Sequence, residues 1–70
     1  RNMATAGKIS GLVIQALRHL GRKNVDQQVI AQLDRRLDDD ARKQLVKDIR
    51  YAPAWIADII RLLADRKSAA

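Results

Sequence analysis

The chain has 70 residues, with 14 Lys and Arg against 8 acidic residues, all of them Asp, and a net charge of +6. A domain of this length buries only about 60% of the surface of its unfolded chain, so the core must be thin. The sequence has no Cys, which excludes disulfides and cysteine-based zinc sites. The absence of Cys also fits a reducing cytoplasm, where we expect the protein. No apolar run approaches the roughly 18 residues that a membrane helix needs. The excess of basic over acidic residues favours an anionic partner, either a nucleic acid or an acidic protein surface.

Both ends of the chain have few apolar residues at helical spacing. Because the sequence begins with Arg1 rather than Met, we expect a further part to precede it. We predict a linker or frayed N-terminus over residues 1–9, one helical interaction domain over residues 10–66, and a frayed C-terminus over residues 67–70.

The segment KISGLVIQALRHLG predicts the first helix. Its apolar residues recur at spacings of three and four, which places them on one stripe and leaves Ile14 off it. Gly21 is the expected C-terminal cap, and Arg18 and His19 lie in the last turn, where the helix dipole favours positive charge. The stripe that we expect to face the core consists of Ile9, Leu12, Val13, Ala16, Leu17 and Leu20.

Two further helices follow. Asn24 stands three residues before Gln27, an Asn variant of the capping box, and predicts a helix start there. Asp38, Asp39 and Asp40 predict the next start, because one carboxylate can cap and the others oppose the positive helix end. We expect this third helix to end near Tyr51. The expected buried residues are Val29, Ile30, Leu33 and Leu37 in the second helix, and Ala41, Leu45, Val46 and Ile49 in the third.

A proline separates the third helix from the fourth. The ring of Pro53 steers Ala52 out of the helical region and suits the first turn of the next helix, PAWIADIIRLLADR. No segment alternates with a period of two, so we expect no strand. The predicted fold is all-α, a compact bundle of four short helices with short connections.

The sequence carries no pattern typical of an enzyme. One histidine cannot hold a zinc or iron ion, and Ser10 has no base at helical spacing. The string AGKIS lacks the first glycine and the direct Lys-Ser order of a phosphate loop. The three consecutive Asp residues are more typical of a helix cap than of a metal site. We therefore predict no catalytic residue, no metal and no cofactor.

A row of basic residues is the strongest sign of a partner. Lys43, Lys47 and Arg50 are spaced i, i+4 and i+7 on the third helix, an arrangement that can follow phosphates or meet an acidic protein, although a solvated helix face has the same pattern. A helix-turn-helix would point the start of this helix at DNA, and that start carries three aspartates.

The segment RYAPAW contains the only Tyr, Pro and Trp of the chain. In so small a domain Trp55 is expected in the core more readily than at an interface, whereas for Tyr51 both positions stay open. Leu62 and Trp55 lie at the margin of the fourth helix, and with Ile14 they could form an apolar surface patch. The predicted partner-binding residues are Lys43, Lys47, Arg50, Tyr51, Trp55 and Leu62.

The stretches GLVIQALRHLG and IAQLDRRLDDDARKQLVKDIRYAPAWIADIIRLLA resemble the C-terminal part of bacterial abortive-infection antitoxins of the AbiEi type. The resemblance covers about Ser10 to Ala64, and RYAPAW is its most specific part. It implies a phage-defence toxin–antitoxin system in which this part neutralises a cognate toxin, commonly a nucleotidyltransferase-like protein. DNA binding and transcriptional autoregulation would belong to a winged-helix N-terminal domain that this chain lacks. A small basic nucleic-acid-binding module is the alternative.

Overall fold

The computed structural model describes the backbone of residues 2–66 and the side chains of residues 9–66. It contains four α-helices and two short 3₁₀ helices, and residues 2–66 include no strand, which confirms the all-α fold. The predicted frayed end at residues 67–70 lies outside the described residues. The elements are α1 (Asn2–Leu20), η1 (Arg22–Asn24), α2 (Gln27–Arg36), α3 (Asp39–Lys47), η2 (Ile49–Tyr51) and α4 (Ala54–Asp65).

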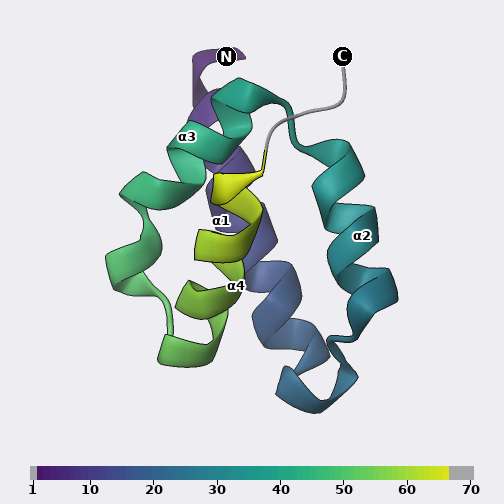
Figure 1. Cartoon of the computed structure of the whole chain (residues 1–70). Coiled ribbons are helices and arrows are strands. Elements are labelled where there is room, and N and C mark those ends of the chain that lie inside the picture. The colour runs from purple at the N-terminus through teal and green to yellow at the C-terminus, as the bar shows by residue number, and fades with distance from the viewer. Residues whose placement is uncertain (1, 67–70) are drawn as a thin grey trace.

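The helices form a small bundle in which α1 and α4 lie between α2 on one side and α3 on the other (Figure 1). α3 packs against both α1 and α4, and α2 is held mainly through α4. α1 is longer than predicted, because its helical backbone includes residues 2–9, which we had assigned to a linker. The start of α3 and the end of α4 lie at the same end of the bundle (Figure 1).

Aspartate side chains cap two of the helices. Asp38 accepts a hydrogen bond from the amide of Ala41 at 2.8 Å, which confirms the predicted start of α3. The capping box predicted at Asn24 is wrong: Asp26 caps α2 by accepting from the amide of Val29 at 3.0 Å. The Asn24 amide nitrogen instead donates to the carbonyl of Leu20 at 2.8 Å and so satisfies the end of α1.

The two predicted helix corners occur where their backbone chemistry places them. Gly21 has φ 85° and ψ 149°, a conformation open to glycine without a Cβ penalty, and its amide closes α1 on the carbonyl of Leu17 at 3.0 Å. Ala52 is extended at φ −102° and ψ 150°, and α4 begins directly after Pro53. α3 itself ends at Lys47, and η2 continues the chain to Tyr51.

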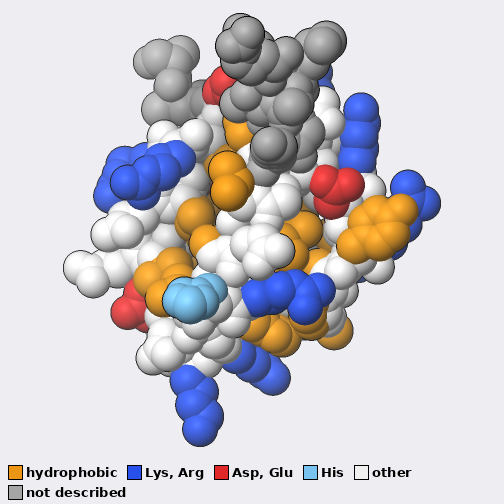
Figure 2. Space-filling view, turned by 180° about the vertical axis from the view of Figure 1, so that it is seen from behind, with side chains coloured by type: hydrophobic (Ala, Val, Ile, Leu, Met, Phe, Trp, Pro, Cys, Tyr) orange, Lys and Arg blue, Asp and Glu red, His pale blue; other side chains and the backbone are white. Residues whose placement is uncertain are grey.

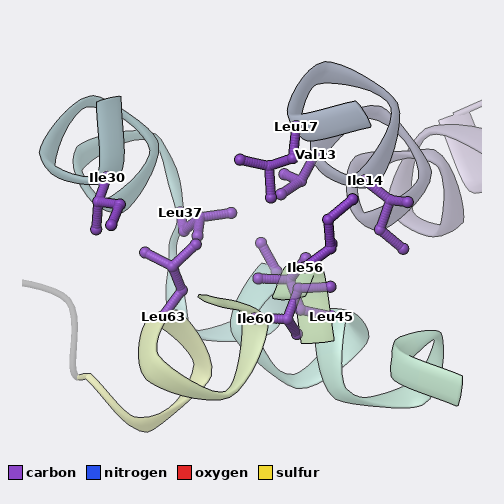
Figure 3. Packing of buried hydrophobic residues seen from close by; sticks show 10 residues of the cluster. Val13, Ile14, Leu17, Ile30, Leu37, Leu45, Ile56, Ile60 and Leu63 are labelled. Atoms are coloured by element: carbon purple, nitrogen blue, oxygen red, sulfur yellow. The ribbon is translucent and has the colours of Figure 1, made fainter. Parts of the chain in front are cut away.

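The core joins all four helices. Leucine and isoleucine side chains from α1, α3 and α4 meet at its centre, and Leu37 and Ile30 extend it toward α2 (Figure 3). Trp55 is half-buried and packs against this cluster rather than occupying its centre. The apolar side chains that are wholly buried are Leu17, Leu45, Ile56, Ile60 and Leu63.

In α1 and α3, the buried face is rotated about the helix axis relative to the apolar stripe that we predicted to face the core. In α1 the buried face includes Ile14, which is 8% exposed, whereas Leu12 is 66% exposed. The predicted core stripe of α1 is therefore wrong by roughly a quarter of a turn, about one residue position around the helix. In α3, Val46 is 51% exposed and Arg42 lies in the buried position instead.

Arg42 is only 4% exposed, and its guanidinium joins three helices. Its Nη1 donates to Asp34 Oδ1 at 2.7 Å and to the carbonyl of Leu63 at 2.8 Å. Its Nη2 donates to the carbonyls of Asp34 at 2.9 Å and Leu37 at 3.0 Å. One side chain of α3 thus satisfies carbonyls at the C-terminal ends of both α2 and α4, where positive charge is also favoured by the helix dipoles.

A second buried polar contact joins α1 to the end of α3. Ser10 is wholly buried, and its Oγ donates to Asp48 Oδ2. Because a buried hydroxyl without a partner destabilises the fold, this hydrogen bond explains why a serine is tolerated on the core face of α1.

Acid should weaken the fold through Asp34. The hydrogen bond from Arg42 lowers the pKa of this carboxyl below its ordinary 3.8, and the hydrogen bond from Arg66 at 3.2 Å adds to the effect against partial desolvation. A group with a depressed folded pKa stabilises the protein above its unfolded pKa, and this stability is lost as the pH falls through the folded value. We expect urea midpoints to fall as the pH drops below about 4.

The matched variants are Asp34→Asn and Asp58→Asn, since Asp58 forms only an exposed pair with Arg61 at 3.1 Å. Asp34→Asn should remove part of the acid dependence, and Asp58→Asn should leave it unchanged. Equal acid dependence in the wild type and Asp34→Asn would contradict this role of Asp34.

Candidate partner-binding surface

The exposed side of α3 and η2 gathers four of the predicted partner-binding residues. Lys43, Lys47 and Arg50 are exposed, as the i, i+4, i+7 spacing predicts. Tyr51 follows them directly and is 68% exposed. We call this surface the basic corner, defined by Lys43, Lys47, Arg50 and Tyr51.

Two arginines contact Tyr51 of the basic corner, one at its ring and the other at its backbone carbonyl. The Arg50 guanidinium carbon lies 5.3 Å from the centroid of the Tyr51 ring, within cation–π distance. Arg18 at the end of α1 donates from Nη2 to the carbonyl of Tyr51 at 3.2 Å. Arg18 is not among the predicted partner-binding residues, and through it α1 adds a further cation to the positive surface.

Most acidic side chains are occupied by interactions within the fold, whereas the described side chains form no ion pair with the cations of the basic corner. Asp26 and Asp38 cap helices, Asp34 pairs with Arg42 and Arg66, and Asp48 accepts from Ser10. Among the side chains of residues 9–66, no ion pair neutralises Lys43, Lys47 or Arg50. The net positive charge is therefore concentrated on exposed side chains and available to a partner.

The other two predicted residues, Trp55 and Leu62, lie on a different part of the surface. They are seven residues apart, and both are about half a turn around α4 from Ala64. Ala64 borders a groove with Lys43 and Val46 of α3, so the flank with Trp55 and Leu62 faces away from α3. The structure does not bring these two residues together with Lys43 and Lys47.

The predicted apolar patch of Ile14, Trp55 and Leu62 is also wrong. Ile14 is buried at 8% exposure because α1 is turned, and Trp55 is half-buried against the core. Leu62 is the member of this set that remains well exposed, at 45%. Val46, between Lys43 and Lys47 in sequence, is an exposed apolar side chain on α3 that the predicted set of partner-binding residues did not include.

The first turn of α3 keeps its negative charge at the surface. Asp39 and Asp40 are exposed there, and Asp38 caps the helix just before them. A recognition helix would point this turn at base edges between phosphates, which carboxylates disfavour. The geometry thus argues against docking of α3 in the helix-turn-helix manner.

Neither membrane nor metal features occur in the described part of the chain. No helix there combines the length and the apolarity that crossing a bilayer requires. In the same residues, no group of three or more His or Asp side chains lies close enough to hold a metal ion.

Comparison with protein families gives a match over most of the chain, whereas two other comparisons give none. No curated protein and no solved structure matches the chain significantly. Residues 1–45, more than half of the chain, match a family of unknown function, DUF6088. This match covers α1, α2 and most of α3, including the buried Arg42 and Lys43 of the basic corner. The chain therefore belongs to the DUF6088 family, a family of unknown function.

Proposed function

We propose that this chain is a non-enzymatic interaction domain that binds and neutralises a cognate bacterial toxin through the basic corner. In this proposal it is the C-terminal part of a cytoplasmic antitoxin of the AbiEi type, acting in phage defence. A nucleotidyltransferase-like toxin would present an acidic surface to the domain. DNA binding and transcriptional autoregulation would reside in a separate N-terminal domain.

The observation that carries the proposal is the exposed Tyr51 beside three cations without an ion pair among the described side chains. An aromatic ring with a stacked arginine suits the centre of a protein interface, where Tyr and Arg are enriched. The surrounding lysines would steer an acidic partner and fix its orientation. The resemblance of RYAPAW and its flanking helices to AbiEi-type antitoxins supports a toxin as that partner.

Binding to the protein encoded by the neighbouring gene tests the proposal. Tyr51→Ala should weaken that binding by at least about 2 kcal/mol, roughly 30-fold, because it removes the apolar anchor. Replacing Lys43 and Lys47 by Glu should slow association and abolish rescue from toxicity. Isothermal titration calorimetry measures the affinity, stopped-flow mixing measures the association rate, and a co-expression growth assay measures the rescue.

Leu62→Ala is the matched control, because Leu62 is an exposed apolar residue on the flank of α4 that faces away from α3. It should leave toxin binding unchanged. A nucleic acid partner would give a different result, namely binding of a DNA or RNA oligonucleotide that falls by about one log unit per phosphate contact for each tenfold rise in salt. Such binding without toxin binding would replace the proposed function by the nucleic-acid alternative.

A further inference from the structure

An apolar groove lies between α1 and α2, away from the basic corner. Its floor includes the buried Val13 and Leu37, and Leu12 and Ala16 are exposed along the α1 side. The groove has a volume of about 260 Å³. In Figure 2, apolar side chains form a broken strip down this face of the molecule, beside a group of basic side chains. The residues that line it are Ile9, Leu12, Val13, Ala16, Leu33, Arg36 and Leu37.

The groove accounts for the mismatch between the apolar pattern of α1 and its burial. The core uses Ser10, Val13, Ile14 and Leu17, yet the sequence also places apolar residues along the neighbouring flank. The α1 residues in the groove, 9, 12, 13 and 16, are spaced i, i+3, i+4 and i+7 and cover roughly 10 Å, about two helical turns. Two turns of open apolar surface match the contact length of a helix laid into a groove.

The charge at the groove selects among possible occupants. Arg36 is the charged residue among the described lining residues, and it is exposed at the rim. A second copy of this chain would bring a further net charge of +6 to a groove whose rim already carries the positive charge of Arg36. An occupant with a carboxylate at that position would meet the charge with an opposite one.

We propose that the groove between α1 and α2 binds an amphipathic helix of a partner protein, with an apolar stripe over Leu12, Ala16 and Leu33 and a carboxylate facing Arg36. This site goes beyond the proposed function, since it shares no residue with the basic corner. Each surface can therefore be disabled without the other.

Titration of the ¹⁵N-labelled chain by NMR tests the proposal. The probe is a helical peptide of about 15 residues, with leucines spaced i, i+3, i+4 and i+7 and glutamates beside them. A second peptide with alanines in place of the leucines keeps the charge, and a third carries lysines in place of the glutamates. We expect the leucine–glutamate peptide to shift amides of α1 and α2, and both other peptides to bind at least about tenfold more weakly.

Leu12→Ser and Val46→Ser are the matched variants, since both replace an apolar residue that is more than half exposed. Leu12→Ser should weaken the leucine–glutamate peptide about tenfold and Val46→Ser should not, with the fold of each variant checked by circular dichroism. Equal affinity of the alanine peptide, or binding unaffected by Leu12→Ser, would overturn the proposal. A dimer in analytical ultracentrifugation that Leu12→Ser dissociates would assign the groove to a second copy and also overturn it.

Discussion

Arg42→Met should destabilise the domain by about 2–4 kcal/mol, because it removes a buried cation that donates hydrogen bonds to Asp34 Oδ1 and to three main-chain carbonyls. The methionine fills similar space but leaves the carbonyls of Leu37 and Leu63 without this donor, and Asp34 without its closest cation. A chain of this length is expected to have roughly 4–10 kcal/mol of stability in total. The variant should therefore be largely unfolded at moderate urea concentrations, as followed by circular dichroism.

The control for this variant is Arg61→Met, which removes an exposed pair with Asp58 and should change stability by less than about 1 kcal/mol. Arg42→Lys tests the geometry of the hydrogen bonds, because an ammonium keeps the charge but cannot reproduce the planar fork of a guanidinium. Stability close to wild type in Arg42→Met would mean that water or a rearranged backbone satisfies these carbonyls, and would contradict the role assigned to Arg42.

Ile60→Ala should produce the second large effect, a loss of about 2–5 kcal/mol. Ile60 is wholly buried in α4 and points into the cluster formed with α1 and α3 (Figure 3). In so thin a core the truncation removes a substantial part of the apolar contacts and leaves a cavity. Urea unfolding at neutral pH measures the change.

Leu62→Ala, two positions further along α4, is the control because its side chain is 45% exposed. It should destabilise the domain by less than about 1 kcal/mol, since surface substitutions away from special features have small effects. Similar losses in Ile60→Ala and Leu62→Ala would show that α4 is packed through a different face from the one described.

The helix boundaries could largely be predicted from the sequence, because caps and proline act through neighbouring residues. Gly21, Asp38 and Pro53 stand where the structure ends or begins helices. The choice of Asn24 over Asp26 failed because both are good capping residues two positions apart, and the intervening 3₁₀ turn decides between them.

The rotation of each helix could not be predicted, because it depends on which flank meets another helix. Leu12 and Ile14 are both apolar, and local spacing favoured the wrong one. Arg42 reads as a surface residue in sequence, since its acceptors on α2 and α4 come together only in the folded chain. The exposure of Lys43, Lys47 and Arg50 could be predicted from their spacing along α3. The position of Arg18 beside Tyr51 could not, because it depends on how α1 packs.

The position of Arg42 has a consequence for the order of folding. Its guanidinium reaches Leu63, 21 residues further along the chain, as well as Asp34, 8 residues before it. The Arg42 guanidinium can be buried only when its acceptors on α2 and on α4 are both in place. We therefore expect its hydrogen bonds to form after the main folding barrier. Interactions that form so late act mainly on the unfolding rate. Arg42 would thus affect the lifetime of the folded domain more than the rate at which the chain folds.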